Sequence, residues 1–520
     1  MKTNARLLSV LILLAALAAG APAQAPAQDR QVLNLSLEDC VAKALKNNLN
    51  VAVEKMTPEL AGLTLAKARE IFLPQFSLSY GNNRQENPSN WWIQGAGTIT
   101  SKLFDYGVTV AETIPTGGSF QLSLQSYKSD TNQAFQLINP RFGSTLRFDF
   151  TQPLLKNFGM TVTKRQILQS AKNLDIAEQQ LESTILDTVY FVQEAYWNFV
   201  YAIENLAVKK QSLQLGQDLL ANNKKQVEFG QLAPLEILNA ESVVAQREAD
   251  LIQAEGLIAR SEEVLKSLIN LSAEGDARAM SIIPSDKAEP KVVSVAYEAA
   301  LKDALERRPD LKILRTTLDT KDLAVTVARN QTLPSLDLNL SYWSPGISGD
   351  MLIYPDNDFF SPPIGKIPGS ASDSLRDAFK LLYSNWNVGL TLSVPVGSIV
   401  SKADLSYARA DLTQSQIRLR SLEQQVALEV SDALRTVEMN AKRVEAYRVA
   451  RELAEKSLDA ETKKLAVGLS TNYFVFEFQD KLASARSAEL RAKIDSILSA
   501  ERLEKAMAVT LEKRGLKISQ

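Results

Sequence analysis

The side chains that could do chemistry in this chain are almost entirely carboxylates. Its 520 residues include 60 Asp and Glu, no His and a single Cys, Cys40. The lack of imidazole excludes a histidine-activated serine or cysteine nucleophile, the usual zinc sites and a haem held by a proximal histidine. One cysteine also excludes disulfides within the chain and thiolate clusters. Carboxylate-only chemistry, as in glycoside hydrolases, is the enzymatic alternative that stays open.

Cofactor and nucleic-acid binding lack their usual sequence features. The chain contains no Gly-x-Gly-x-x-Gly motif after a strand and no phosphate-binding Gly-x-x-x-x-Gly-Lys loop. A formal net charge of −2 argues against nucleic acid as a partner, because a basic stripe would be expected. We interpret Cys40 as a residue that packs between helices, the common role of a lone thiol. The sequence therefore predicts no catalytic residue, no cofactor, no metal and no nucleic-acid partner.

The elements that would position functional residues come from one unit that occurs twice. Residues 38–74 match residues 298–334 at a constant offset of 260, and a second match at a slightly shorter offset joins Gly230 to Gly468. The first match includes Arg69/Arg329, Leu73/Leu333 and Pro74/Pro334. We predict two structural repeats, 28–290 and 291–520. Each reads short helix, strand, insertion, strand, very long helix, break and long helix.

The first 27 residues have the pattern of a cleaved secretory signal. Lys2 and Arg6 precede an apolar run over residues 7–17, and small residues follow from Ala21 onward. The run is shorter than the ~20 residues of a membrane-spanning helix, so we predict cleavage rather than an uncleaved anchor. The protein is therefore expected to leave the cytoplasm.

Two stretches without proline predict unusually long helices, from Pro153 to Pro234 and from Pro395 to the end. Apolar residues recur every seven positions in both, which imposes a left-handed supercoil on a helix of 3.6 residues per turn. The repeat runs through Ile185, Val192, Phe199, Leu206, Leu213, Leu220 and Val227, and through Val430, Val437, Val444, Leu458 and Leu465, with Arg451 as an interruption. Residues 160–229 would form a rod of roughly 105 Å. A solvated adaptor or structural coiled coil would show the same periodicity.

Four segments alternate apolar and polar residues, as strands with one apolar face do. They lie at 76–80, 146–150, 336–342 and 386–394. A tilted strand crosses a bilayer with ~9–11 residues, and we interpret each segment as part of such a strand. A half-buried sheet over a soluble core would show the same alternation.

Further features favour a membrane-spanning sheet. A proline joins each strand to its helix, and four tryptophans lie at or near strand ends, as in the aromatic belts of membrane proteins. These residues are Pro74, Pro153, Pro334 and Pro395, and Trp91, Trp92, Trp343 and Trp386. No apolar run after the signal is long enough for a spanning helix, so any crossing must be made by strands. Because a barrel needs at least eight strands, several chains would have to share one.

In the order and spacing of these features the chain resembles the TolC-like outer membrane efflux proteins. The resemblance covers residues 35–511 and rests on Arg308-Pro309-Asp310-Leu311, on the Leu-Pro before each first strand and on the proline after each second strand. Asn48-Leu49-Asn50-Val51 opens the first copy. The resemblance implies an α+β membrane protein and a homotrimer. Twelve strands would form one outer membrane β-barrel, continued by a long periplasmic α-barrel of coiled-coil helices that narrows at the hairpin tips.

Two helix breaks predict those tips. Gly230 and Gly468 end the long helices, as a glycine in left-handed conformation does. By the resemblance, residues 467–471 dock the hairpin of a periplasmic adaptor protein, and the first tip follows the family pattern less closely. The candidate docking residues are Gly230, Leu232, Pro234, Val467, Gly468, Leu469 and Thr471. Simple helix-turn-helix chemistry would account for the glycines but not for an exposed Val and Leu.

The same resemblance implies acidic residues around the closed entrance, just beyond the second tip. Glu477 and Asp480 are the candidates, and Glu236 has the comparable place in the first copy. Phe474 stands where the family commonly has its first acid, so an aromatic constriction is the alternative. The apolar residues around Phe474 could equally face neighbouring helices.

The insertions between paired strands differ. Residues 82–144 contain an alternating hairpin around Pro115-Thr116-Gly117-Gly118, which we interpret as extracellular or barrel-top, with two extra barrel strands as the alternative. Residues 344–384 are rich in Pro, Gly and Ser and predict a surface loop that ends in a short helix at 372–382.

The function predicted from these features is a passive exit duct in the outer membrane, with a large periplasmic extension. Its expected partners are a periplasmic adaptor (membrane fusion) protein, an inner-membrane transporter and outer membrane lipid, in an efflux or type I secretion system. The alternatives are a periplasmic coiled-coil adaptor or structural protein and a secreted carboxylate-dependent hydrolase. The strands argue against the adaptor, and the tandem duplication with its long helices argues against the hydrolase.

Overall fold

The computed structural model describes residues 32–271, 280–290, 295–358, 361–394, 397 and 399–516. The predicted signal peptide, 1–27, and Pro395 lie outside the described residues. The chain forms two compact units. The hairpin unit comprises Met1–Asn48, Phe191–Lys291 and Asn440–Leu498, and the sheet unit comprises Leu49–Tyr190, Val292–Met439 and Ser499–Gln520. Each unit contains segments from both predicted repeats.

The first elements of the two predicted repeats begin at a constant offset. The first helices are α2 (Leu37–Asn47) and α7 (Tyr297–Arg307), followed by α3 (Leu49–Arg69) and α8 (Pro309–Gln331), then by strands β2 (Gln75–Pro88) and β7 (Ser335–Ile353). Each pair starts 260 residues apart, as the sequence predicts. The later pairs are β5 (Ile138–Pro153) and β9 (Asn385–Ser393), α5 (Arg165–Glu228) and α10 (Ile399–Ala466), and α6 (Leu235–Leu268) and α11 (Asn472–Ala506).

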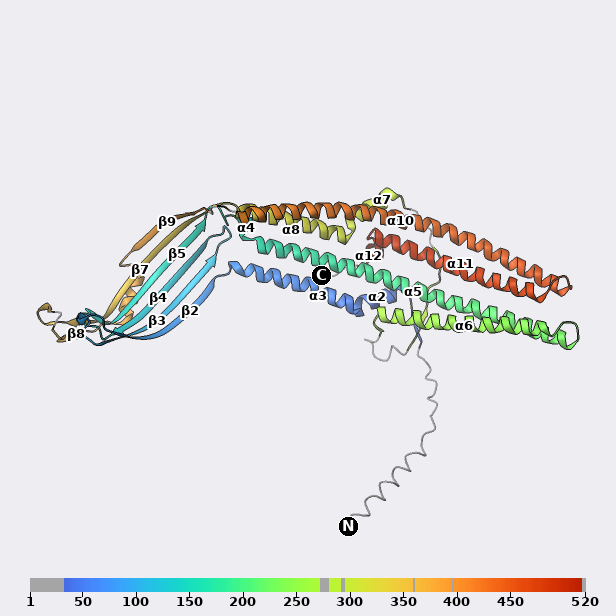
Figure 1. Ribbon diagram of the computed structural model, residues 1–520, viewed down its shortest axis with the longest axis horizontal. Helices are drawn as coiled ribbons and strands as arrows, with labels where there is room; N and C mark the ends of the chain where they lie inside the picture. The colour runs from blue at the N-terminus through green and yellow to red at the C-terminus, as the bar shows by residue number, and fades with distance from the viewer. Residues whose placement is uncertain are drawn as a thin grey trace, which may run out of the picture. The chain divides into compact units, whose positions relative to one another are not determined.

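Six long strands form one antiparallel sheet in the sheet unit (Figure 1). β3 (Thr98–Thr113) and β4 (Ser119–Thr131) lie between β2 and β5, and the order is β2-β3-β4-β5-β7-β9, with short β8 (Gly365–Ile367) beside the outer part of β7. The expectation of four strands per chain is therefore wrong. Residues 82–144 extend β2 and add two full strands to the sheet, so the interpretation as an extracellular or barrel-top hairpin is corrected.

The register gives the sheet one apolar and one polar face. One row across all six strands is Phe76, Val110, Leu122, Phe148, Tyr342 and Trp386. The adjacent row, on the opposite face, is Ser77, Thr109, Ser123, Arg147, Trp343 and Asn385. Trp343 therefore lies within β7 and not at a strand end, and the guanidinium carbon of Arg147 is 5.5 Å from its ring centroid. β7 continues for ten more residues to Ile353, so Trp343 does not mark the end of its strand, and its place in an interfacial belt stays a prediction.

Residues 344–384 are not a surface loop as predicted. Their first part completes β7, and helix α9 (Ala371–Phe379) packs against β5 and β7. The short helix itself was expected at 372–382, close to its observed bounds. Small irregular or short elements complete the chain: η1 (Glu70–Phe72), η2 (Trp92–Gln94), η4 (Pro355–Asn357), α4 (Met160–Thr163) and α12 (Thr510–Lys513).

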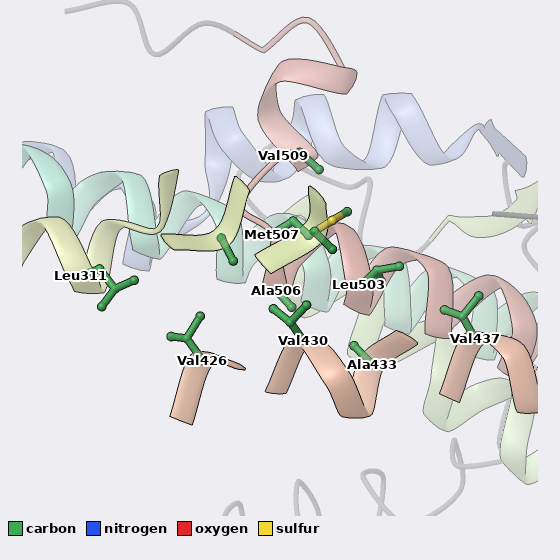
Figure 2. Packing of buried hydrophobic residues seen from close by; sticks show 11 residues of the cluster. Leu311, Val426, Val430, Ala433, Val437, Leu503, Ala506, Met507 and Val509 are labelled. Atoms are coloured by element: carbon green, nitrogen blue, oxygen red, sulfur yellow. The ribbon is translucent and has the colours of Figure 1, made fainter. Parts of the chain in front are cut away.

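The helices of the sheet unit pack around a buried cluster (Figure 2). Apolar residues at alternating spacings of four and three on α10, namely Val426, Val430, Ala433 and Val437, face Leu503 and Ala506 of α11, Met507, Val509, Ala300 and Ala304 of α7, and Leu311 of α8. This spacing is the apolar seam of a coiled coil. Arg308, immediately before α8, forms an ion pair with α10: its Nη1 is 2.8 Å from Oε2 of Glu429.

The hairpin unit contains the two helix turns and a small sheet. β1 (Val32–Leu35) pairs in parallel with β6 (Ser281–Pro284). In Figure 1 the chain turns back sharply between α5 and α6 and between α10 and α11. Cys40 is fully buried on α2, in agreement with its prediction as a packing residue. Across the described ranges, no helix is both long enough and apolar enough to span a membrane.

Candidate functional site

The two hairpin tips share one backbone motif. Gly230 has φ +71° and Gly468 has φ +78°, so both adopt the left-handed conformation that the sequence predicts for them. The amide of Gly468 donates to Leu465 O and that of Leu469 donates to Lys464 O, at 3.0 and 2.9 Å. Gly230 and Gln231 make the equivalent bonds to Val227 O and Gln226 O. This pair of bonds is the Schellman motif, which satisfies the last helix carbonyls where the chain reverses.

The second tip presents apolar side chains to solvent. Leu469 is 79% exposed, and Val467 beside it is also exposed. Thr471 immediately precedes α11, and its carbonyl accepts from the amide of Phe474 at 3.2 Å. In the first tip Leu232 is half-buried, Pro234 caps α6, and Phe229 is the exposed apolar residue. All seven candidate docking residues therefore lie in the two turns. What these residues bind stays a prediction.

The two hairpins pack on each other just beyond the tips. Leu219 of α5, Ala240 of α6, and Val475 and Phe476 of α11 form a buried cluster. Phe474 and Tyr473 are instead exposed, with their rings in an edge-to-face arrangement 5.6 Å apart. The aromatic stretch 473–476 thus divides into one pair that faces solvent and one pair that faces neighbouring helices.

The candidate acidic residues differ in their surroundings. Asp480 is 60% exposed, and its Oδ1 is 2.8 Å from Arg247 Nη2. Glu477 is half-buried and pairs with Lys481 on the same helix, at 2.6 Å. Glu236 lies in the first turn of α6 and is also half-buried. Two of the three carboxylates therefore have a cation as their nearest charged partner.

Arg247 is the buried residue of this region that the sequence analysis missed. Only 4% of it is exposed. Its Nη1 donates to Ser212 O at 2.8 Å and to Gln479 Oε1 at 2.9 Å, while its Cζ lies 5.7 Å from the Phe476 ring centroid. Together with the ion pair to Asp480, these contacts join α5, α6 and α11.

A sequence signal for Arg247 exists. Ala240 and Ala254, seven residues on either side of it, are buried, so Arg247 occupies a small-residue position of the heptad. Gly216 on α5 supplies the space, since a Cβ there would lie 2.9 Å from Arg247 Nη1. A glycine inside a helix costs about 0.5–1 kcal/mol relative to alanine. A charged residue in a column of alanines, opposite a helical glycine, indicates such a buried cation.

Glu461 connects the second tip to its own helix. Its carboxylate accepts hydrogen bonds from Ser470 Oγ and from Lys464 Nζ, the latter at 3.0 Å. The Ser470 bond, followed by that of Lys464, holds the pKa of Glu461 below its ordinary value. The tip conformation therefore depends on an ionised carboxylate.

Comparison with known proteins places this architecture among bacterial export proteins. The family model described as "Outer membrane efflux protein" matches residues 150–271 and 300–509. Nodulation protein T of Rhizobium leguminosarum bv. trifolii is 20% identical over 461 residues, covering 88% of this chain and 82% of its own length. Outer membrane protein TolC of Escherichia coli is 22% identical over 420 residues, covering 76% of this chain and 80% of its own.

The fold also matches solved structures. The outer membrane protein VceC of Vibrio cholerae superimposes with a TM-score of 0.63 at 15% identity, over 91% of this chain and 96% of its own. The outer membrane channel CmeC of Campylobacter jejuni gives a TM-score of 0.63 at 16% identity, over 91% of this chain and 85% of its own.

Proposed function

The chain belongs to the outer membrane efflux protein family and is an outer membrane efflux channel, and from that premise we propose that three copies form a passive exit duct. One observation carries this proposal. The sheet has an apolar row across every long strand, yet β2 and β9 each pair on one side only among the described residues. An unpaired edge requires another chain or a closed barrel.

The helices of the sheet unit support association of copies. α3 exposes five apolar residues at alternating spacings of four and three, all at least 62% exposed: Leu49, Val53, Met56, Leu60 and Leu63. Such a stripe is a coiled-coil seam without a partner. A neighbouring copy would bury it, as the seam of α10 is buried within one chain.

Six strands from each of three copies give a barrel of eighteen, not the twelve that the resemblance implies. Barrel diameter grows roughly in proportion to strand number. The polar row that includes Ser77, Thr109 and Arg147 would then line the lumen, and the apolar row would face outer membrane lipid.

The remaining partners follow from the tips. The exposed Val467 and Leu469 are suited to the apolar contact of a periplasmic adaptor protein, which would connect the duct to an inner-membrane transporter. The entrance carboxylates Glu236, Glu477 and Asp480, with Phe474 as the aromatic alternative, are proposed to narrow the closed end. This chain makes and breaks no bond in that scheme, so the transporter supplies the energy.

Fractionation and mass measurement test the trimer. The purified protein should come from the outer membrane and have three times the chain mass in mild detergent. Val53→Asp with Leu60→Asp should abolish the trimer, because carboxylates would be buried in the α3 seam. Ala66→Asp, exposed on α3 outside the stripe, is the matched control and should leave it intact. Recovery of the wild type as a soluble periplasmic monomer would refute the duct.

A further inference from the structure

Helix α9 lies on the apolar face of the sheet. The register places Ser144 opposite Gly346, on the same face as Leu146 and Phe148, because alternate strand residues share a face. Ser144 Oγ and Ser374 Oγ are 2.9 Å apart. A Cβ on Gly346 would lie 2.0 Å from the backbone oxygen of Ser374. The backbone of α9 therefore touches the face that we assign to lipid.

The contact is made by small residues. Ser374 and Ala378, one helical turn apart on α9, are buried. Opposite them the sheet presents the small residues Ser144, Ser344 and Gly346. The next residues on the same face, Leu146 on β5 and Tyr342 on β7, are larger. Small residues let backbones approach closely without an aqueous driving force, as at helix contacts inside membranes. The larger side chains of α9 are consequently left on its outer side.

The row that carries α9 lies between an apolar and a charged zone of the same face. Followed across the sheet, it consists of Tyr80, Tyr106, Ser126, Ser144 and Gly346. Two residues further along each strand, on the same face and toward Gln75 of β2, are apolar residues that include Leu78 and Leu124. Four residues along in the opposite direction are the charged residues Arg84, Lys102 and Asp130. Tyrosine is enriched where a bilayer meets water. The tyrosines thus mark the height of α9 as that boundary.

The outer side of α9 and the turn after it expose large apolar residues. Phe379 and Leu382 are each 59% exposed and Tyr383 is 58% exposed. They precede Trp386, which belongs to the apolar row of β9. The charged residues of α9 are Asp373, Arg376 and Asp377, and Arg376 forms an ion pair with Asp373 at 2.6 Å. The apolar face of the sheet is therefore continued by the C-terminal end of α9.

We propose that α9 is an interfacial helix of the outer membrane, with Phe379, Leu382 and Tyr383 inserted among lipid acyl chains beside the Tyr80 and Tyr106 row. This inference rests on the proposed barrel. Its occupant is lipid, because α9 packs on the same face of β5 and β7 as the apolar residues Leu146 and Phe148, and the residues after it lead into Trp386 of the apolar row. An apolar surface at that height, continuous with the lipid-facing row, has acyl chains as its neighbour.

Single spin labels in the trimer, reconstituted in phospholipid vesicles, test the inference. Cys40→Ser removes the native thiol, whose pKa burial already raises to about 12. Labels are placed through Phe379→Cys and Leu382→Cys. Leu390→Cys, on the apolar row of β9, serves as the lipid control, and Lys366→Cys of β8 serves as the water control. Oxygen, which concentrates in lipid, and a water-soluble nickel chelate are compared as relaxing agents.

Labels at 379 and 382 should follow the Leu390 control, with high oxygen and low nickel accessibility. Nickel accessibility equal to that of Lys366 would place α9 in water, and protection from both agents would place a second copy or another protein on it; either result overturns the inference. A Leu390 control that is itself accessible to nickel would instead contradict the barrel, so the two failures are distinguishable.

Discussion

At the scale of single residues, Arg247 carries the contact between the two helical hairpins. It is buried, it donates to the Ser212 carbonyl and to Gln479, and it compensates the charge of Asp480. Removing a buried partner costs more than the bond itself gains, because the other group loses its hydrogen bond away from water. The electrostatics of the proposed entrance therefore depend on a residue that does not itself face the solvent.

Arg247→Met and Asp480→Asn should have opposite effects on cation block. If Asp480 lines the entrance, Arg247→Met removes its neutralising partner and strengthens block by a divalent cation, whereas Asp480→Asn weakens it. Arg247→Met should also destabilise the hairpin unit by about 1–3 kcal/mol, since Gln479 loses its donor. Single-channel recording in planar bilayers measures the block, and hydrogen exchange measures the stability.

Glu477→Gln combined with Asp480→Asn is the companion variant. It should weaken block and reduce cation selectivity more than Asp480→Asn alone. Unchanged block and selectivity in all three variants would remove the carboxylates from the entrance and leave Phe474 as the constriction.

Acid should loosen the second tip through Glu461. Its folded pKa is lowered from 4.5, so its contribution to stability is fully present above that value and is lost as pH falls through the lower folded pKa. The protection of residues 465–472 against hydrogen exchange should fall as the pH drops below 4.5, and it should fall more than the protection of the first tip does. Glu461→Gln should remove this difference, and a pH dependence that persists in the variant would assign it to another group.

The residue scale also shows what sequence can and cannot predict. Gly230 and Gly468 were predictable because a left-handed helix end restricts the residue to glycine. The partner of Asp480 was not, because Arg247 lies 233 residues away and only packing brings the two together. The division of the aromatic stretch into buried Phe476 and exposed Phe474 has the same origin.

At the scale of elements, the second hairpin tip combines exposed apolar residues with a backbone turn held by two hydrogen bonds. Leu469→Asp should abolish export while the trimer and its membrane insertion survive, because the residue is exposed and distant in sequence from every strand. Leu469→Met preserves an apolar contact and should export normally. Export assays with the cognate pump, with trimer yield measured in parallel, make the comparison.

Gly468→Pro tests the same tip through its backbone. Proline fixes φ near −65°, and Gly468 has φ +78°, so the turn must rearrange. We expect export to fail here as well. Intact export in both Leu469→Asp and Gly468→Pro would show that the adaptor binds elsewhere.

The strands were only partly predictable at this scale. Residues 76–80 and 146–150 alternate cleanly, but in β3 the outer half places Leu103 on the polar face and Lys102 on the apolar face. Alternation therefore indicates a strand only in the half of β3 next to the turn at 115–118. For this reason the sequence favours a hairpin there. Its place between β2 and β5 depends on pairing over long sequence separations, which periodicity does not encode.

At the scale of the whole molecule, the strand count sets the width of the proposed barrel. Eighteen strands should give a diameter about one and a half times that of a twelve-stranded barrel, since diameter grows roughly linearly with strand number. Electron microscopy of the trimer in lipid nanodiscs measures this width directly. A twelve-stranded ring, with β3 and β4 outside the barrel wall, would contradict the proposal.

The unpaired edges of the sheet also determine the order of events in biogenesis. A lone copy in a bilayer would expose the outer backbone groups of β2, a strand of 14 residues, and of β9 to hydrocarbon, at several kcal/mol for each unsatisfied group. That total exceeds the 5–15 kcal/mol by which folded proteins are typically stable. In the proposed trimer, copies must therefore meet before or during entry into the membrane. The rate of insertion should rise more steeply than the concentration of exported chain, whereas a barrel made by one chain would insert in simple proportion to it.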